Sequence, residues 1–153
     1  MKILFLDIDG VLNSERSSAA LGGYPHDFSE RELAKFDPVA LALVRKLLDA
    51  TGASVVLSTS WRSTFTCEQV EHGLGIPVVG ATPDLGGDWC RADEIAHWLA
   101  AHPEVTRFAI VDDLPMDFEF ASIQDRFVQT NPAWGLSLMD YRQLRHLLTD
   151  NPP

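Results

Sequence analysis

Short apolar runs alternate along the chain with stretches in which apolar residues recur at helical spacing. The apolar runs predict β-strands near residues 2–7, 53–57, 77–79, 108–111 and 126–129, the last of them at an edge of the sheet. The helical spacing predicts helices over residues 38–51, 67–74, 92–101 and 138–148. This alternation is typical of a three-layer α/β/α sandwich with a mainly parallel sheet.

Two of the expected helices have clear boundary signals in the sequence. Asp37 can cap one of them, Pro38 suits its first turn, and Gly52 can end it. Ser137 is the expected cap of the last helix. These signals do not depend on the apolar spacing, so we expect both helices to begin at these residues.

Residues 1–150 are expected to form a single domain. The chain has 153 residues, 46% of them hydrophobic, which is enough for one apolar core. The least regular stretch, residues 14–36, contains Gly22-Gly23-Tyr24-Pro25 and is too short for a second core but long enough for a flap. Whether this flap closes as a lid stays open. The Asn-Pro-Pro tail at 151–153 is expected to fray.

The chain is acidic, with a formal net charge of −10. Such a surface repels a long phosphate backbone, so extended duplex binding is not expected, whereas a nucleotide or a strand end remains compatible. No apolar run approaches the roughly eighteen residues of a membrane-spanning helix, and no secretion signal is evident. We therefore expect a soluble cytoplasmic protein without a membrane partner; its oligomeric state stays open.

Cysteine and histidine give no sign of a metal site. Cys67 and Cys90 lie too far apart for a Cys-x-x-Cys motif, and we expect both to be reduced. The five histidines show no spacing typical of metal ligands, so we interpret them as surface or structural residues.

Polar residues follow three of the predicted strands, where each strand ends. Asp7 and Asp9 follow the first strand, Ser58-Thr59-Ser60 follow the second, and Asp112-Asp113 follow the strand at 108–111. In open parallel sheets, ligands bind beyond the carboxyl ends of the strands. We therefore expect these side chains to face one crevice.

The negative charge of the acidic residues in this crevice must be compensated. Four carboxylates at close range repel one another, and a hard divalent cation with oxygen ligands relieves the repulsion. We expect Mg²⁺, with Asp7, Asp9, Asp112 and Asp113 as candidate ligands. Gly10 allows a tight turn after the strand, in which backbone N–H groups can face a phosphate.

Four motifs together resemble those of the haloacid dehalogenase (HAD) superfamily. They are DIDGVLN at 7–13, the hydroxyl of Ser58, the basic Arg91 at the start of a helix, and the acidic pair 112–113. In addition, LSTSWR at 57–62 and FVQTNPAWGLS at 127–137 are similar to small phosphatase-like domains of that superfamily, including domains of nucleic-acid repair proteins. The resemblance spans nearly the whole chain and implies a Rossmann-like fold with a minimal cap or none.

The resemblance also implies roles for the acidic residues. Asp7 would be the nucleophile that forms an aspartyl phosphate. Asp9 would be the general acid for the leaving alcohol and then the base for the attacking water, while its backbone carbonyl meets the metal. Asp113 aligns with the usual acidic ligand and would hold Mg²⁺ together with Asp7. Whether Asp112 also binds the metal directly stays open.

The phosphate-binding residues include one departure from the family. Ser58 and Thr59 would hydrogen-bond the phosphoryl oxygens, and Arg91 would neutralise their charge. The family most often has lysine at the position of Arg91, and arginine differs from lysine in shape and reach. Arg62, which follows the hydroxyls, is therefore a rival for this role.

The resemblance implies a Mg²⁺-dependent phosphomonoester hydrolase, a HAD phosphatase. An open cleft would admit a phosphorylated small molecule such as a nucleotide, or a nucleic-acid end, as its partner. The alternative is a non-catalytic phosphate-binding or regulatory module on the same fold, against which the intact Asp7, Asp9, Ser58 and Asp113 argue. Dehalogenases of the superfamily lack the second acid, so Asp9 argues against that reaction.

Overall fold

A five-stranded parallel sheet forms the centre of the molecule in the computed structural model, which describes residues 1–116, 118–119 and 121–149. The strand order is β3-β2-β1-β4-β5, which confirms the predicted α/β fold with β5 at an edge. Each strand lies within two residues of its predicted range. The strands are β1 (Lys2–Leu6), β2 (Ser54–Leu57), β3 (Val78–Ala81), β4 (Arg107–Asp112) and β5 (Phe127–Gln129).

All four predicted helices are present. They are α3 (Pro38–Thr51), α4 (Cys67–Leu74), α5 (Arg91–Ala101) and α7 (Leu138–Leu148). Asp37 accepts hydrogen bonds from the backbone N–H groups of Val39 and Ala40, and Ser137 accepts one from that of Asp140, so both predicted caps are confirmed. The unpredicted helices are short: α1 (Glu15–Leu21), α2 (Glu30–Leu33), the 3₁₀ helix η1 (Ser60–Ser63) and α6 (Ala121–Gln124).

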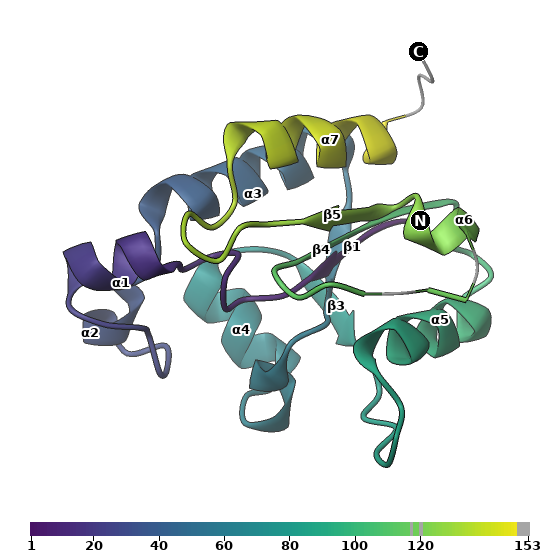
Figure 1. Cartoon of the computed structure of the whole chain (residues 1–153), viewed down its shortest axis with the longest axis horizontal. Helices are drawn as coiled ribbons and strands as arrows, with labels where there is room; N and C mark the ends of the chain where they lie inside the picture. The colour runs from purple at the N-terminus through teal and green to yellow at the C-terminus, as the bar shows by residue number, and fades with distance from the viewer. Residues whose placement is uncertain (117, 120, 150–153) are drawn as a thin grey trace.

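Helices cover both faces of the sheet (Figure 1). On β1, Leu4 and Leu6 belong to the apolar cluster formed with α3, α4 and α7. Ile3 and Phe5 belong to the second cluster, which includes residues of α5. The central strand is therefore apolar on both sides, as expected of a buried parallel strand.

The segment 14–36 carries α1 and α2 at one end of the molecule (Figure 1). It is tied to the main domain by an ion pair of 3.0 Å between Arg16 and Asp37 and by packing of Phe28 against Trp61. Its action as a lid remains a prediction. The tail at 151–153, which we expected to fray, lies outside the described residues.

The strand order places a topological switch point at β1. The chain runs from β1 to β2 and β3 on one side, then crosses back through α5 to β4 on the other. A crevice for ligands is expected beyond the carboxyl ends of β1 and β4, where the two halves diverge. The acidic motifs of the sequence follow these two strands.

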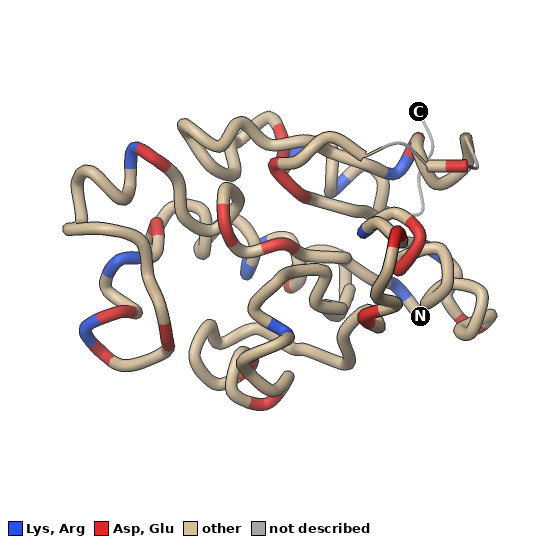
Figure 2. The backbone as a smooth tube through the Cα atoms, turned by 60° about the horizontal axis from the view of Figure 1, so that its bottom comes forward, with Lys and Arg blue, Asp and Glu red and all other residues tan. Residues whose placement is uncertain are grey.

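Acidic positions outnumber basic ones along the backbone, and both are spread over helices and loops (Figure 2). Cys67 and Cys90 are free thiols. Within the described part of the chain, no helix has both the length and the apolar character needed to cross a bilayer.

Candidate active site

Asp7 is fixed at the carboxyl end of β1, where its backbone N–H donates to the carbonyl of Val111 on β4 at 3.1 Å. Its side chain is 5% exposed. One carboxylate oxygen accepts a hydrogen bond of 2.8 Å from the backbone N–H of Ile8, and the other lies 3.0 Å from Nη1 of Arg91. The Thr59 hydroxyl also hydrogen-bonds this carboxylate. Asp7 is thus buried and held at a defined place.

Asp112 and Asp113 follow at the end of β4. Asp112 is fully buried; one of its oxygens pairs with Arg91 at 2.5 Å, and the other accepts a hydrogen bond of 2.9 Å from the backbone N–H of Leu114. Asp113 is more exposed. Asp7, Asp112 and Asp113 each contribute one carboxylate oxygen to a group in which these atoms lie within 4.8 Å of one another. Three carboxylates in this arrangement could hold a divalent cation.

The three carboxyl groups share an excess of negative charge. Burial, and secondly the charge of Asp112, raise the pKa of Asp7 to about 7, although Arg91 opposes the shift. Burial also raises the pKa of Asp112 against the opposing charge of Arg91. The pKa of Asp113 is raised by burial and by the charge of Asp112. A cation between them would relieve this repulsion, so the donor set fits a metal.

Gly10 makes room for Asp113. Its φ of +74° is in the left-handed region, and a Cβ built at this position would lie 2.4 Å from Cγ of Asp113. The carbonyl of Gly10 accepts a hydrogen bond of 2.9 Å from the hydroxyl of Thr130, which follows β5. The glycine in the Asp-x-Asp-Gly motif is therefore required by both backbone conformation and space.

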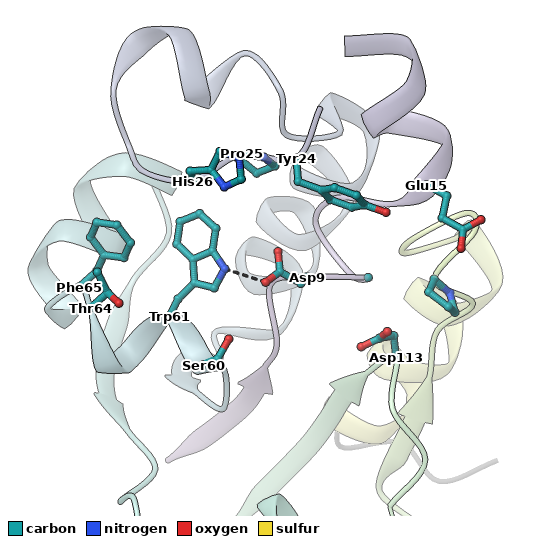
Figure 3. Close-up of a pocket in the computed structure, with 12 residues that line it drawn as sticks. Asp9, Glu15, Tyr24, Pro25, His26, Ser60, Trp61, Thr64, Phe65 and Asp113 are labelled. Atoms are coloured by element: carbon teal, nitrogen blue, oxygen red, sulfur yellow. Dashed lines mark hydrogen bonds between the residues drawn. The ribbon is translucent and has the colours of Figure 1, made fainter. Parts of the chain in front are cut away.

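Asp9 is exposed and lines a cavity, with Asp113 across the opening from it (Figure 3). Its Oδ1 accepts a hydrogen bond of 2.8 Å from Nδ2 of Asn13, and its Oδ2 accepts one of 2.9 Å from Nε1 of Trp61. The structure thus does not bring the Asp9 side chain into the group of candidate metal ligands among the described residues. Ligation through Asp9 remains a prediction.

The hydroxyl of Ser58 has an unused hydrogen-bonding capacity. Its Oγ is buried and has no hydrogen-bond partner among the described residues, whereas its backbone N–H donates to the carbonyl of Leu6 at 3.0 Å. Buried polar groups normally have hydrogen-bond partners, so a buried hydroxyl without one is a candidate for hydrogen-bonding a ligand. Thr59 instead uses its hydroxyl on Asp7 and on the backbone N–H of Trp61.

The two candidate arginines have different surroundings. Arg91, the first residue of α5, contacts both Asp7 and Asp112. Arg62 pairs with Glu94 at 2.6 Å and donates to the carbonyl of Thr59 at 2.8 Å, while its Nε is buried without a partner among the described residues. Of the two, Arg91 is the one that reaches the acidic group.

Two cavities adjoin the site. The first, of about 640 Å³, opens beside Asp9 and Asp113 and is lined by aromatic side chains, among them Tyr24, Trp61 and Phe65 (Figure 3). None of its described lining residues is a lysine or an arginine. The second, of about 630 Å³, is lined by both Arg62 and Arg91.

Sequence reasoning identified neither Asn13 nor Trp61 as a hydrogen-bond partner of Asp9. The hydrogen bond of Trp61 to Asp9 joins residues 52 positions apart, so no local pattern predicts it. Asn13 lies four residues after Asp9 in the turn that Gly10 begins, and this short spacing is the signal that could have pointed to it.

The sheet order and the acidic strand ends define an α/β domain of the HAD type. A model of the family described as "HAD domain in Swiss Army Knife RNA repair proteins" matches residues 3–141. The chain belongs to this family, which confirms the resemblance and supports a phosphatase-like role. No curated protein and no solved structure matches the chain significantly.

Proposed function

We propose that this protein is a Mg²⁺-dependent phosphomonoester hydrolase that forms an aspartyl phosphate on Asp7. The observation that carries the proposal is the group of three carboxylate oxygens from Asp7, Asp112 and Asp113 within 4.8 Å of one another. Their raised pKa values and the orphan hydroxyl of Ser58 support it, since a metal and a phosphoryl group would supply the missing partners.

Asp7 and Asp113 are the best candidates for direct metal ligands. The oxygens of Asp7 contact Arg91 and the backbone N–H of Ile8, so its proposed role as a ligand follows from the family motif and not from free oxygens. Asp112 is fully buried, with one oxygen on Arg91 and the other on the backbone N–H of Leu114, whereas Asp113 is partly exposed. Asp112 therefore serves to hold Arg91 in place and to strengthen the negative charge of the site. Mg²⁺, when bound, would neutralise charge on the phosphoryl oxygens.

The proposed reaction has two steps. In the first, a carboxylate oxygen of Asp7 forms a bond to phosphorus while the bond to the leaving oxygen breaks, and Asp9 gives its proton to that oxygen. In the second, Asp9 takes a proton from a water molecule, whose oxygen attacks phosphorus and frees the Asp7 carboxylate. Ser58 and Arg91 hold the phosphoryl oxygens throughout, since hydroxyl and guanidinium donors stabilise their charge.

The proposed substrate is a nucleotide or a terminal phosphate of a nucleic acid. The cavity beside Asp9 supports this choice, because its aromatic side chains can pack against a flat ring. The family description, which names RNA repair proteins, also supports it. The net charge of −10 disfavours an extended duplex, so the protein would act on the end of a strand or on a free nucleotide.

The test is phosphate release with Mg²⁺ and with EDTA. The panel comprises an aryl phosphate, sugar phosphates, nucleoside 5′- and 3′-monophosphates, and oligonucleotides with a terminal phosphate. Asp7→Asn should abolish the metal-dependent release, whereas Asp125→Asn, an exposed acid outside the site, should retain it. Absence of release from every substrate by folded protein would refute the proposal and favour a phosphate-binding module.

A further inference from the structure

We infer that Trp61 and Asn13 are positioning residues that together orient the Asp9 carboxyl group toward the leaving group. The inference rests on the proposed function, in which Asp9 protonates the leaving oxygen. It concerns a pair of hydrogen bonds that reach Asp9 from different parts of the chain, one from its own turn and one from η1.

Asp9 would be poorly oriented without these donors. It is exposed at the edge of the cavity, where a short carboxylate side chain can rotate. Nδ2 of Asn13 fixes Oδ1 at 2.8 Å, and Nε1 of Trp61 fixes Oδ2 at 2.9 Å. Because each oxygen has its own donor, both the position and the plane of the carboxyl group are set.

Asn13 is itself rigid. Its side chain is buried, and its Oδ1 accepts a hydrogen bond of 3.1 Å from the backbone N–H of Gly10. This assigns the amide orientation, since the oxygen faces an N–H group and the nitrogen faces a carboxylate. The turn that carries Asp9 therefore also supplies its first donor.

Trp61 is fixed by packing. Its ring lies in an aromatic cluster with Phe28, Phe36 and Phe65, at centroid distances of 5.2, 5.9 and 5.3 Å. Only 7% of the residue is exposed. A buried indole N–H usually has a partner, and here the partner is Asp9. Phe28 and Phe36 both lie in the segment 14–36, so this segment supports the orientation of Asp9 through Trp61.

The two hydrogen bonds leave the acid free to act. Each carboxyl oxygen can accept more than one hydrogen bond, so a protonated Asp9 can keep both donors and still donate its O–H into the cavity. Figure 3 shows Asp9 between Trp61 and Tyr24, with Asp113 across the opening. A leaving oxygen must lie in this opening to receive the proton, and catalytic groups lose much of their effect when displaced by about 1 Å.

The experiment compares two esters of similar size whose leaving groups differ in their need for a proton. Benzyl phosphate releases an alkoxide, which must be protonated, whereas para-nitrophenyl phosphate releases a stable phenolate. The parameter is kcat/KM, because it reports the step in which the leaving group departs and not the later hydrolysis of the aspartyl phosphate. Trp61→Phe removes the N–H donor but keeps an aromatic ring in the cluster.

We expect Trp61→Phe to lower kcat/KM for benzyl phosphate about 10- to 100-fold. A general acid typically contributes about 10²- to 10⁴-fold to the rate, and a misoriented Asp9 should lose part of this contribution. The loss of kcat/KM for para-nitrophenyl phosphate should be less than about threefold, because its phenolate departs without a proton from Asp9. Trp98→Phe is the control, because it makes the same substitution in the second apolar cluster, where the indole packs against Phe5 and His102 and not against Asp9. It should lower the melting temperature but leave the ratio of the two kcat/KM values unchanged.

Equal losses on both esters in folded Trp61→Phe would overturn the inference. If this variant does not fold, Asn13→Asp decides, because it removes the Nδ2 donor and keeps an oxygen for the N–H of Gly10. A loss confined to benzyl phosphate supports the inference, and equal losses overturn it. Absence of Mg²⁺-dependent turnover of either ester by the wild-type protein would instead overturn the proposed function, and the inference with it.

Discussion

Replacing Gly10 by alanine should disrupt the proposed metal site. The residue has φ +74°, and an L-residue in the left-handed region costs about 1–2 kcal/mol. The added Cβ would lie 2.4 Å from Cγ of Asp113. Cβ of Asp113 would lie 2.6 Å away as well, so rotation of this side chain does not relieve the clash and the backbone must also shift. The loss of stability should therefore exceed the backbone cost, and Mg²⁺ should lose a proposed ligand.

The loss of Mg²⁺ binding in Gly10→Ala should be visible in a thermal melt. A ligand present at a hundred times its Kd stabilises the folded protein by about 2.7 kcal/mol, and a hundredfold weaker site removes most of that. For a chain of this size, about 1 kcal/mol corresponds to roughly 2–4 °C in Tm. Mg²⁺ should thus raise the Tm of the wild-type protein by about 5–10 °C and that of Gly10→Ala by much less.

Gly52→Ala is the matched control for this experiment. Gly52 has a φ of +67° at the end of α3, and nothing lies within 4 Å of the position of its added Cβ. The variant bears the same backbone cost without disturbing Asp113. If Gly10→Ala and Gly52→Ala retained the same increase in Tm with Mg²⁺, the assignment of Asp113 as a ligand would be refuted.

Three further predictions concern the charges and hydroxyls of the site. Arg91→Gln should lower kcat/KM about 10²- to 10³-fold, and Arg91→Lys should recover part of it, as initial rates will show. In EDTA, Tm should fall as the pH rises from about 4 to 7. Folding raises the pKa of Asp7 from 3.8 to about 7, so in this range the folded protein keeps a proton that the unfolded chain has lost. Asp7→Asn should reduce the slope of Tm against pH. Ser58→Ala removes a buried hydroxyl that has no hydrogen-bond partner among the described residues. In denaturant titrations it should therefore leave the free energy of unfolding unchanged or raise it by up to about 1 kcal/mol. It should nevertheless lower kcat/KM.

The sequence predicted the sheet and the longer helices because their signals are local. Apolar runs mark β1 and β4, and Asp37 with Pro38 marks the start of α3. The short helices α1 and α2 have seven and four residues, too few for their apolar spacing to be recognised. The acidic residues could be placed together because the carboxyl ends of parallel strands share one edge of the sheet.

Side-chain partners were harder to predict, since they depend on tertiary packing. Sequence alone could not choose between Arg62 and Arg91. In the structure Glu94 engages the first, and Asp7 with Asp112 engage the second, which favours Arg91 as the proposed phosphate-binding residue. The contact between Trp61 and Asp9 likewise requires η1 to lie over the turn after β1.

The proposed mechanism requires that Asp7 becomes phosphorylated during turnover. The most direct measurement is acid quenching of a reaction with para-nitrophenyl phosphate carrying radiolabelled phosphorus, followed by mapping of the labelled peptide. A hydroxylamine-sensitive label should appear on the peptide with Asp7. It should be absent in EDTA and increased in Asp9→Asn, which lacks the base for the second step. Metal-dependent turnover without label on this peptide, in either protein, would contradict this mechanism.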